Sequence, residues 1–260
     1  EEECIAIYEL NNENALVPHL LDGKFAAWPP YFRKKLEHHW NDWLKALYQS
    51  EAGLNAAWGR LESGEQLGTV KLGPAAAERA KFPAARGNDF VRFAIELVEN
   101  WNNELRAHCR KQGRAGAGVA VVPFSFDTQF RGNLPWQYSI THSADVANFG
   151  MYFWNMQSML TRPPSLYVLD SHTVAGKPTV IYETNAGRPG SYRGEYPLML
   201  AAFASWQDWD AIFFHYWAGA ADGIPDEQYL LMPLPPPTVE HYWSAVQHHS
   251  DPVMCAAMAI

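Results

Sequence analysis

Short apolar runs alternate with helix-like patterns along this 260-residue chain, and this alternation limits the folds that it can adopt. The runs are rich in β-branched and aromatic residues and are short enough to be buried strands. They are Ile5–Leu10, Val119–Phe124, Val146–Phe149, Thr179–Glu183 and Ala211–His215. Strands that alternate with helices form βαβ units, so we expect all of these runs to be parallel neighbours in one curved sheet.

Helical patterns fill most of the intervening chain. Apolar residues recur at intervals of three and four after Pro29-Pro30, and Asn88 or Asp89 is a candidate N-cap for a later helix. The expected helices are those beginning at Pro30 and at Pro252, and Glu51–Trp58, Phe90–Lys111, Tyr192–Trp206 and Val239–His248. We expect residues 59–86 to be a connector and Ser165–Leu169 to be extended.

Two of the apolar runs carry a glutamate where the strand is expected to give way to a loop. Glu13 follows the first run, and Glu183 closes the run that begins at Thr179. In a parallel α/β barrel the loops after the strands form the active-site face, so acids at these positions are typical of catalysis. Two carboxylates that face one another across such a site are the groups used in glycoside hydrolysis.

The sequence at these positions resembles a known group of enzymes. Asn12-Glu13, Glu183 and the ending His215-Tyr216-Trp217 together resemble clan A glycoside hydrolases, and the string Glu9–Asn14 resembles a strand-4 motif of the cellulase-like glycoside hydrolase family 5. The resemblance implies a TIM (β/α)8 barrel with catalytic glutamates after strands 4 and 7. This chain would then carry strands 4 to 8 of a single partial barrel domain, residues 1–260, with a helical insertion at residues 14–86 and with strands 1 to 3 upstream of Glu1.

The same resemblance assigns the chemistry. It implies a retaining O-glycoside hydrolase that cleaves β-linked glycans or oligosaccharides, with Glu13 as the acid/base and Glu183 as the nucleophile. The alternative is a non-catalytic, carbohydrate-binding fragment of a barrel, since strands 1 to 3 are missing from this alignment. Glu9 precedes Glu13 by four residues and is expected to join a structural charge network deeper in the barrel.

Further residues are candidates for substrate binding, and each has a structural alternative. By resemblance, Asn12 hydrogen-bonds a sugar 2-hydroxyl, Tyr152 hydrogen-bonds the nucleophile, and Trp217 forms the floor under the sugar at the cleavage point. The alternatives are a turn asparagine and two core aromatic residues. Asn185 and His215 lie at strand ends that face the same loops. The relatives often carry a histidine two residues before the tyrosine, whereas this chain has Gly150.

Composition excludes several other partners. A net charge of −8 argues against a nucleic-acid groove, which needs a basic stripe. The chain has no run of roughly 20 apolar residues, so we expect no membrane span. The pairs His38-His39 and His248-His249 are adjacent and lack metal-ligand spacing, so we predict no metal and no cofactor. We expect a soluble protein whose partner is a carbohydrate, and the sequence is consistent with secretion or periplasmic export of a longer precursor.

Overall fold

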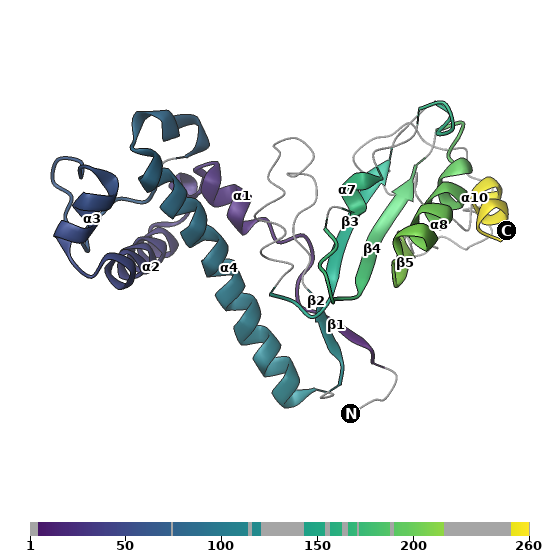
Figure 1. Ribbon diagram of the computed structural model, residues 1–260, viewed down its shortest axis with the longest axis horizontal. Helices are drawn as coiled ribbons and strands as arrows, with labels where there is room; N and C mark the ends of the chain where they lie inside the picture. Colours follow the sequence, from purple (N-terminus) through teal and green to yellow (C-terminus); the bar gives the residue numbers. More distant parts are fainter. Residues whose placement is uncertain are drawn as a thin grey trace. The chain divides into compact units, whose positions relative to one another are not determined.

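The computed structural model describes residues 5–73, 75–113, 116–120, 143–153, 157–162, 166–170, 172–187, 190–215 and 251–259. They form two compact units (Figure 1). Asn11–Gly113 is the helical unit, and Glu1–Leu10 with Arg114–Ile260 is the sheet unit. Each unit has its own packed interior.

The helical unit consists of helices joined by short turns. Its elements are α1 (Leu16–Leu21), the 3-10 turn η1 (Lys24–Ala27), α2 (Pro30–Tyr48), α3 (Glu51–Trp58), the 3-10 turn η2 (Ala76–Lys81) and α4 (Ala84–Gln112). Pro30 occupies the first turn of α2, where a missing N–H costs nothing. The Ser50 side chain caps α3 by accepting a hydrogen bond from the Gly53 N–H.

The sheet unit alternates strands with helices. Its elements are β1 (Ile7–Glu9), β2 (Gly118–Ala120), β3 (Ala147–Phe153), α7 (Tyr167–Asp170), β4 (Thr179–Ala186), α8 (Glu195–Gln207), β5 (Ala211–Phe214) and α10 (Pro252–Met258). Every strand pairing in the part of the chain that the structure describes is parallel, with β1 beside β2 and with β3, β4 and β5 in sequence order. The expectation of parallel strands is therefore confirmed. The expectation of a single sheet is not, because the described strands form one sheet of two strands and another of three.

Hydrogen bonds connect the two groups of strands. The Asp145 N–H donates to the Val119 carbonyl at 2.8 Å, and the Val119 N–H donates to the Asp145 carboxylate at 3.1 Å. Asp210 has the same role before β5, where its carboxylate accepts from the Thr179 N–H at 2.8 Å. These aspartates satisfy backbone groups at the starts of the strands, where the ladder has not yet begun.

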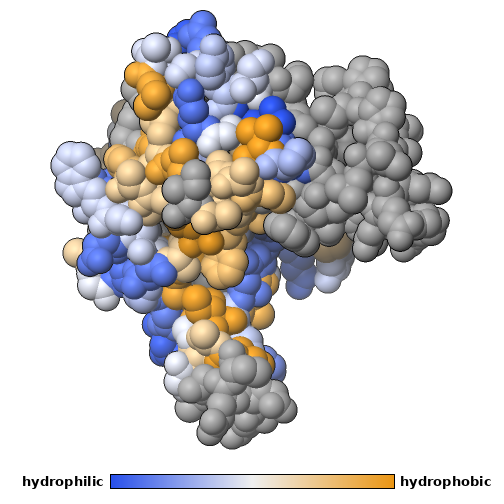
Figure 2. Space-filling view, turned by 90° about the vertical axis from the view of Figure 1, so that its right-hand side faces the viewer, coloured by the Kyte–Doolittle hydropathy of each residue, from blue (hydrophilic) through white to orange (hydrophobic). Residues whose placement is uncertain are grey.

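The core of the sheet unit lies between β3–β5 and α8. Tyr196 and Leu200 of α8 are fully buried against Ile181 and Phe149 of the sheet. The outer side of this layer also carries apolar residues. Figure 2 shows them gathered on the face to which α8 and α10 belong, and Leu198, Trp206, Val253 and Met258 are large exposed side chains of these two helices.

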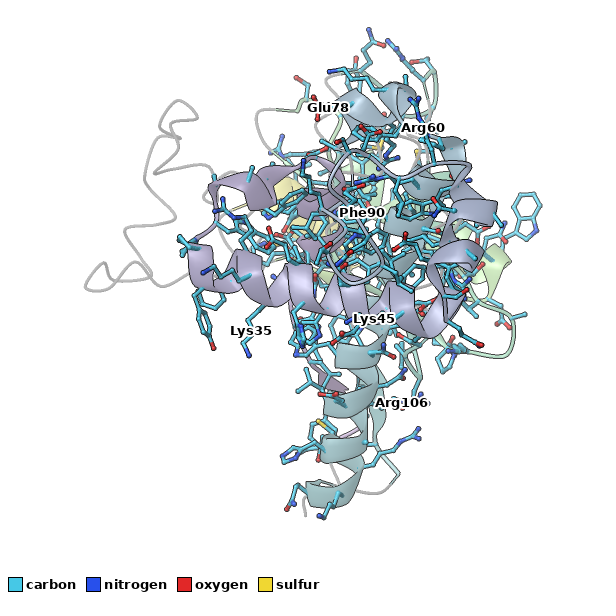
Figure 3. The ribbon with its side chains drawn as sticks, turned by 90° about the vertical axis from the view of Figure 1, so that its left-hand side faces the viewer. Lys35, Lys45, Arg60, Glu78, Phe90 and Arg106 are labelled. Atoms are coloured by element: carbon cyan, nitrogen blue, oxygen red, sulfur yellow. The ribbon has the colours of Figure 1, made fainter. Side chains whose placement is uncertain are left out.

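Stacked tryptophans form the centre of the helical unit. Trp40 is fully buried, and its ring stacks on Trp43 at 5.6 Å and on Trp58 at 6.2 Å between centroids. Phe90 of α4 meets Trp40 edge to face at 5.6 Å and lies in the middle of the unit, whereas Lys35 lies on its outer edge (Figure 3). These aromatic rings pack the helices of the unit against one another.

Polar contacts from α2 and α4 hold the irregular segment between α3 and η2. Trp40 Nε1 donates to the Lys71 carbonyl, and the Asn41 amide forms a reciprocal pair with the backbone of Val70. Arg86 forms two hydrogen bonds with the Glu65 carboxylate, at 2.7 and 2.9 Å, and both side chains are almost completely buried. Burial acts to raise the pKa of Glu65, but hydrogen bonds from Arg86 and the Lys71 N–H outweigh it and hold that pKa below its ordinary value.

The expected start of the long helix was wrong. Helix α4 begins at Ala84, inside the expected connector, and no side chain caps it. Asp89 accepts hydrogen bonds from the Tyr48 hydroxyl at 2.5 Å and from Trp58 Nε1 at 2.7 Å instead. The Asp89 carboxylate, which the sequence pattern predicted to be a helix cap, therefore binds side chains of α2 and α3.

Other boundaries also differ from the sequence expectations. The segment expected to be extended at Ser165–Leu169 contains the short helix α7, and β4 continues past Glu183 to Ala186. The segment at residues 121–126 and the expected helix at residues 239–248 lie outside the described residues. No described helix is long and apolar enough to cross a membrane.

The buried Arg86–Glu65 pair predicts an asymmetric response to mutation. Replacement of Arg86 by Met leaves the Glu65 carboxylate buried without its cation, so the free energy of unfolding should fall by about 3–5 kcal/mol. Lys81→Ala removes the exposed partner of Glu78 and should change it by less than about 0.5 kcal/mol. Urea unfolding followed by tryptophan fluorescence measures both, and equal small effects would show that the buried pair is unimportant.

Candidate active site

Strand β4 contains one more residue than its neighbours between Ile181 and Thr184. On one side Phe149 and Gly150 of β3 pair with Ile181 and Glu183. On the β5 side, Ile181 and Thr184 pair with Ile212 and Phe214, so three steps along β4 match two along β5. This is a β-bulge, which redirects side chains and is common beside functional sites.

The bulge places Glu183 on the face of the sheet opposite to α8. Ile181 packs in the core against α8, and the Thr184 hydroxyl hydrogen-bonds the Tyr196 hydroxyl of α8. In a regular strand, alternation would turn Glu183 to the same side as Ile181. The extra residue shifts this alternation, so both Ile181 and Thr184 face the helix while Glu183 faces away from it.

Glu183 meets two side chains on that face. The Tyr152 hydroxyl on β3 donates a hydrogen bond to Glu183 Oε1. His215 Nδ1, just after β5, lies 3.9 Å from the same oxygen, and the Tyr152 and His215 rings meet edge to face at 6.0 Å. The Glu183 side chain is 15% exposed, so the carboxylate is sheltered but reachable. Tyr152, Glu183 and His215 therefore come together, although Glu183 lies within β4 and not at its end, where the sequence predicted it.

The geometry of the bulge requires a glycine at position 150. A Cβ on Gly150 would lie 2.3 Å from the Glu183 carbonyl oxygen and 2.6 Å from Cε1 of the Tyr182 ring. Both distances are far below van der Waals contact, and one of them involves backbone. A side chain at position 150 is therefore incompatible with this bulge.

Asn185 anchors the end of β5. Its Nδ2 donates to the His215 carbonyl at 2.7 Å, and its Oδ1 accepts from the Ala186 N–H at 2.8 Å. The residue is fully buried. These bonds fix the backbone that carries His215, and a direct contact of Asn185 with a substrate stays a prediction.

Burial and the charge of Glu183 shift the pKa values of two nearby residues, His215 and Glu9. Burial lowers the pKa of His215, and the negative charge of Glu183 partly opposes this effect. Desolvation and then repulsion by Glu183 raise the pKa of Glu9 on β1, although Glu9 keeps contact with solvent. Burial and the charge of Glu183 thus shift the pKa of His215 in opposite directions, whereas both raise the pKa of Glu9.

The other predicted residues belong to the helical unit or fall outside the described residues. Asn12 and Glu13 begin the helical unit, in the bend that leads to α1, and Glu13 has a positive φ of 47°, which is uncommon for a residue with a side chain. The pairing of Glu13 with Glu183 stays a prediction, since each belongs to a different unit. Trp217 and Arg188 lie outside the described residues.

Arg193 has a structural partner. Its guanidinium binds the Asp251 carboxylate at 2.5 and 3.0 Å, and Asp251 in turn caps α10. This pair joins the residues just before α8 to the start of α10. Within the described ranges, no three His, Cys, Asp or Glu side chains gather in a way that could hold a metal ion.

Comparisons with known proteins give a fold likeness only. The sequence matches no protein-family model and no curated protein. Among solved structures it is similar to a β-galactosidase from the Antarctic haloarchaeon Halorubrum lacusprofundi (TM-score 0.52, 16% identity, covering 82% of this chain and 33% of that one). It is also similar to a β-galactosidase from the psychrophilic Marinomonas ef1 (0.57, 16%, 86% and 35%). An exo-β-agarase matches at a TM-score of 0.44, too low to support an argument.

These neighbours share a fold with the chain. At 16% identity the likeness does not carry their activity to this chain, which spans about a third of the length of the two β-galactosidases. The parallel α/β arrangement described here is therefore one that glycoside hydrolases adopt.

The bulge predicts that Gly150→Ala is destabilising. The added methyl group must displace either the Glu183 backbone or the Tyr182 ring, which we expect to lower the free energy of unfolding by about 1–3 kcal/mol. Gly116→Ala is the control, because nothing lies within 4 Å of the position that its added methyl group would take. Thermal unfolding of both variants measures the difference, and an unperturbed Gly150→Ala would contradict the bulge geometry.

The charge of Glu183 predicts coupled titrations. In Glu183→Gln the pKa of His215 should fall further, because burial still lowers it and the charge that raised it is gone. The pKa of Glu9 should move down towards its ordinary value, because the repulsion by Glu183 is removed. Asp208→Asn, which removes an exposed carboxylate at the end of α8, should leave both unchanged. NMR titration of the imidazole and carboxyl signals measures these shifts; a rise in the His215 pKa would contradict the contact.

Proposed function

We propose that this chain is part of a retaining β-glycoside hydrolase with a TIM (β/α)8 barrel, related to the cellulase-like members of clan A, and that it carries both catalytic glutamates, Glu13 and Glu183. The observation that carries the proposal is the carboxylate of Glu183, which a bulge turns away from the helix layer and to which Tyr152 donates a hydrogen bond. The parallel pairing of β1 with β2 and of β3, β4 and β5 with one another, together with the fold likeness to two β-galactosidases, supports it.

The proposed domain is one barrel interrupted after its fourth strand. The first strand of this chain takes the place of strand 4 and β4 that of strand 7, and the residues after Glu13, residues 14–86, form an insertion. The helical unit contains this segment together with α4 and packs around its own tryptophans and its own ion pair, which supports an insertion that folds together with α4. Eight strands close such a barrel, and the described residues contain five.

The mechanism assigns one step to each glutamate. Glu183, ionised and held by the Tyr152 hydroxyl, attacks the anomeric carbon while Glu13 protonates the departing glycosidic oxygen. Glu13, now ionised, then takes a proton from the water that hydrolyses the glycosyl-enzyme ester. This double displacement retains the anomeric configuration and requires the two carboxyl groups to lie roughly 5 to 5.5 Å apart. Asn12 would bind the sugar 2-hydroxyl, and His215 and Trp217 would line the same subsite.

The neutral form of His215 fits this scheme. Its lowered pKa keeps the imidazole uncharged at neutral pH, so it does not form an ion pair that would weaken Glu183 as a nucleophile. Tyr152 supplies a hydrogen bond without a full charge. Both neighbours therefore orient the carboxylate and leave its negative charge available for the reaction.

A non-catalytic, carbohydrate-binding barrel is the alternative. A hydrolase turns over a glycoside, whereas a non-catalytic barrel only binds it. Aryl β-galactosides, β-glucosides and β-mannosides are the substrates to test, and β-galactosides come first because of the two structural neighbours. The assay uses protein that carries all eight strands of the proposed barrel.

The proposed roles predict different phenotypes for the two glutamates. Glu183→Gln keeps the shape of the side chain but removes the nucleophile, and kcat should fall by several powers of ten, each of which corresponds to about 1.4 kcal/mol of barrier. Glu13→Ala should impair substrates with poor leaving groups much more than those with good ones, because good leaving groups need little protonation.

Azide provides the decisive control for Glu13. In Glu13→Ala, added azide should restore turnover by replacing the water that Glu13 activates, and it should give the β-glycosyl azide with retention. Azide should not restore Glu183→Gln to the same product. Equal loss of Glu13→Ala on good and poor leaving groups, together with no azide effect, would overturn the acid/base role.

A further inference from the structure

Tyr182 lies beside Glu183 on the same face of the sheet. Gly150 and Tyr152 are two residues apart on β3, so their side-chain directions share one face, and Tyr152 reaches Glu183 there. The Tyr182 ring occupies the space into which a side chain at position 150 would point, at 2.6 Å from where its Cβ would lie. Tyr182 and Glu183 therefore face the same way, although they are consecutive in a strand.

The bulge and Gly150 together create this arrangement. The extra residue in β4 lets two consecutive side chains face away from α8, and the missing side chain at position 150 makes room for an aromatic ring. Tyr182 and Glu183 are the two members of β4 that are only partly buried, whereas the rest of the strand is buried. Consecutive Cα atoms are about 3.8 Å apart, so the two side chains leave the strand beside one another.

We infer that Tyr182 contacts the sugar whose anomeric carbon faces Glu183 and that it contributes to the choice of sugar. This inference rests on the proposed glycosidase function. A partly exposed tyrosine offers an apolar ring on which the C–H face of a pyranose packs and a hydroxyl that can bond sugar hydroxyl groups. Sugars that differ in the orientation of one hydroxyl present different faces to such a ring, so the contact discriminates between them.

The experiment measures binding separately from turnover. In a Glu183→Gln background, the affinity for methyl β-D-galactopyranoside and methyl β-D-glucopyranoside is measured by calorimetry, with and without a second substitution. Tyr182→Ala should weaken binding of the preferred sugar by about tenfold and reduce the preference between the two sugars. Tyr182→Phe should retain most of the affinity, because it keeps the ring, and lose part of the preference.

Trp206→Ala is the matched control. It removes a large aromatic side chain that is 84% exposed on α8, on the other side of the sheet from Glu183, and should leave both affinities unchanged. Thermal unfolding is followed in all variants. If Tyr182→Ala does not fold, Tyr182→Leu replaces it, since it keeps apolar volume but has no flat ring.

The outcomes separate this inference from the proposed function. The glycosidase proposal stands if the protein without substitutions hydrolyses an aryl glycoside and Glu183→Gln abolishes that activity. The role of Tyr182 is refuted if Tyr182→Ala or Tyr182→Leu, in the Glu183→Gln background, binds both sugars as tightly as Glu183→Gln alone. A loss of stability in Tyr182→Ala with unchanged affinities assigns the ring to packing and also refutes the contact. If no glycoside is hydrolysed and none is bound, both proposals fail together.

Discussion

The single extra residue in β4 is the constraint on which the candidate site depends. A regular strand would send Glu183 into the layer between the sheet and α8, where the carboxylate would be buried among apolar side chains at a large desolvation cost. The bulge keeps Ile181 and Thr184 in that layer and turns Glu183 to the opposite face. Gly150 is the matching feature on the neighbouring strand, because any larger residue there would collide with the bulged backbone.

The helical unit shows how an irregular segment is ordered without secondary structure of its own. Trp40 and Asn41 bond the backbone at positions 70 and 71, and Arg86 reaches Glu65 from the first turn of α4. Each contact joins residues that are distant in sequence, so the segment is held only once the helices have packed. A buried ion pair adds little net stability compared with apolar residues, but breaking one is costly, so it specifies this arrangement over alternatives.

Much of the fold could be predicted from local pattern, because helix and strand formation depend on periodicity and caps that lie within a few residues. Helix α3 was predicted with the bounds that it has, since Ser50 supplies a local cap. The start of α4 was not predictable in this way. Asp89 looks like a cap in sequence, yet Tyr48 and Trp58 bind its carboxylate, and only packing brings those residues together.

The candidate site divides along the same line. The sequence by itself determined that Glu183, Tyr152 and His215 sit near the ends of parallel strands, because the alternation of strands and helices orders the strands and aligns their carboxyl ends. Only the tertiary structure decided which face each side chain occupies. A bulge is a mismatch between two paired strands, so the sequence of either strand alone does not reveal it. The positions of Tyr182 and Gly150 relative to Glu183 follow only from the pairing of β3 with β4.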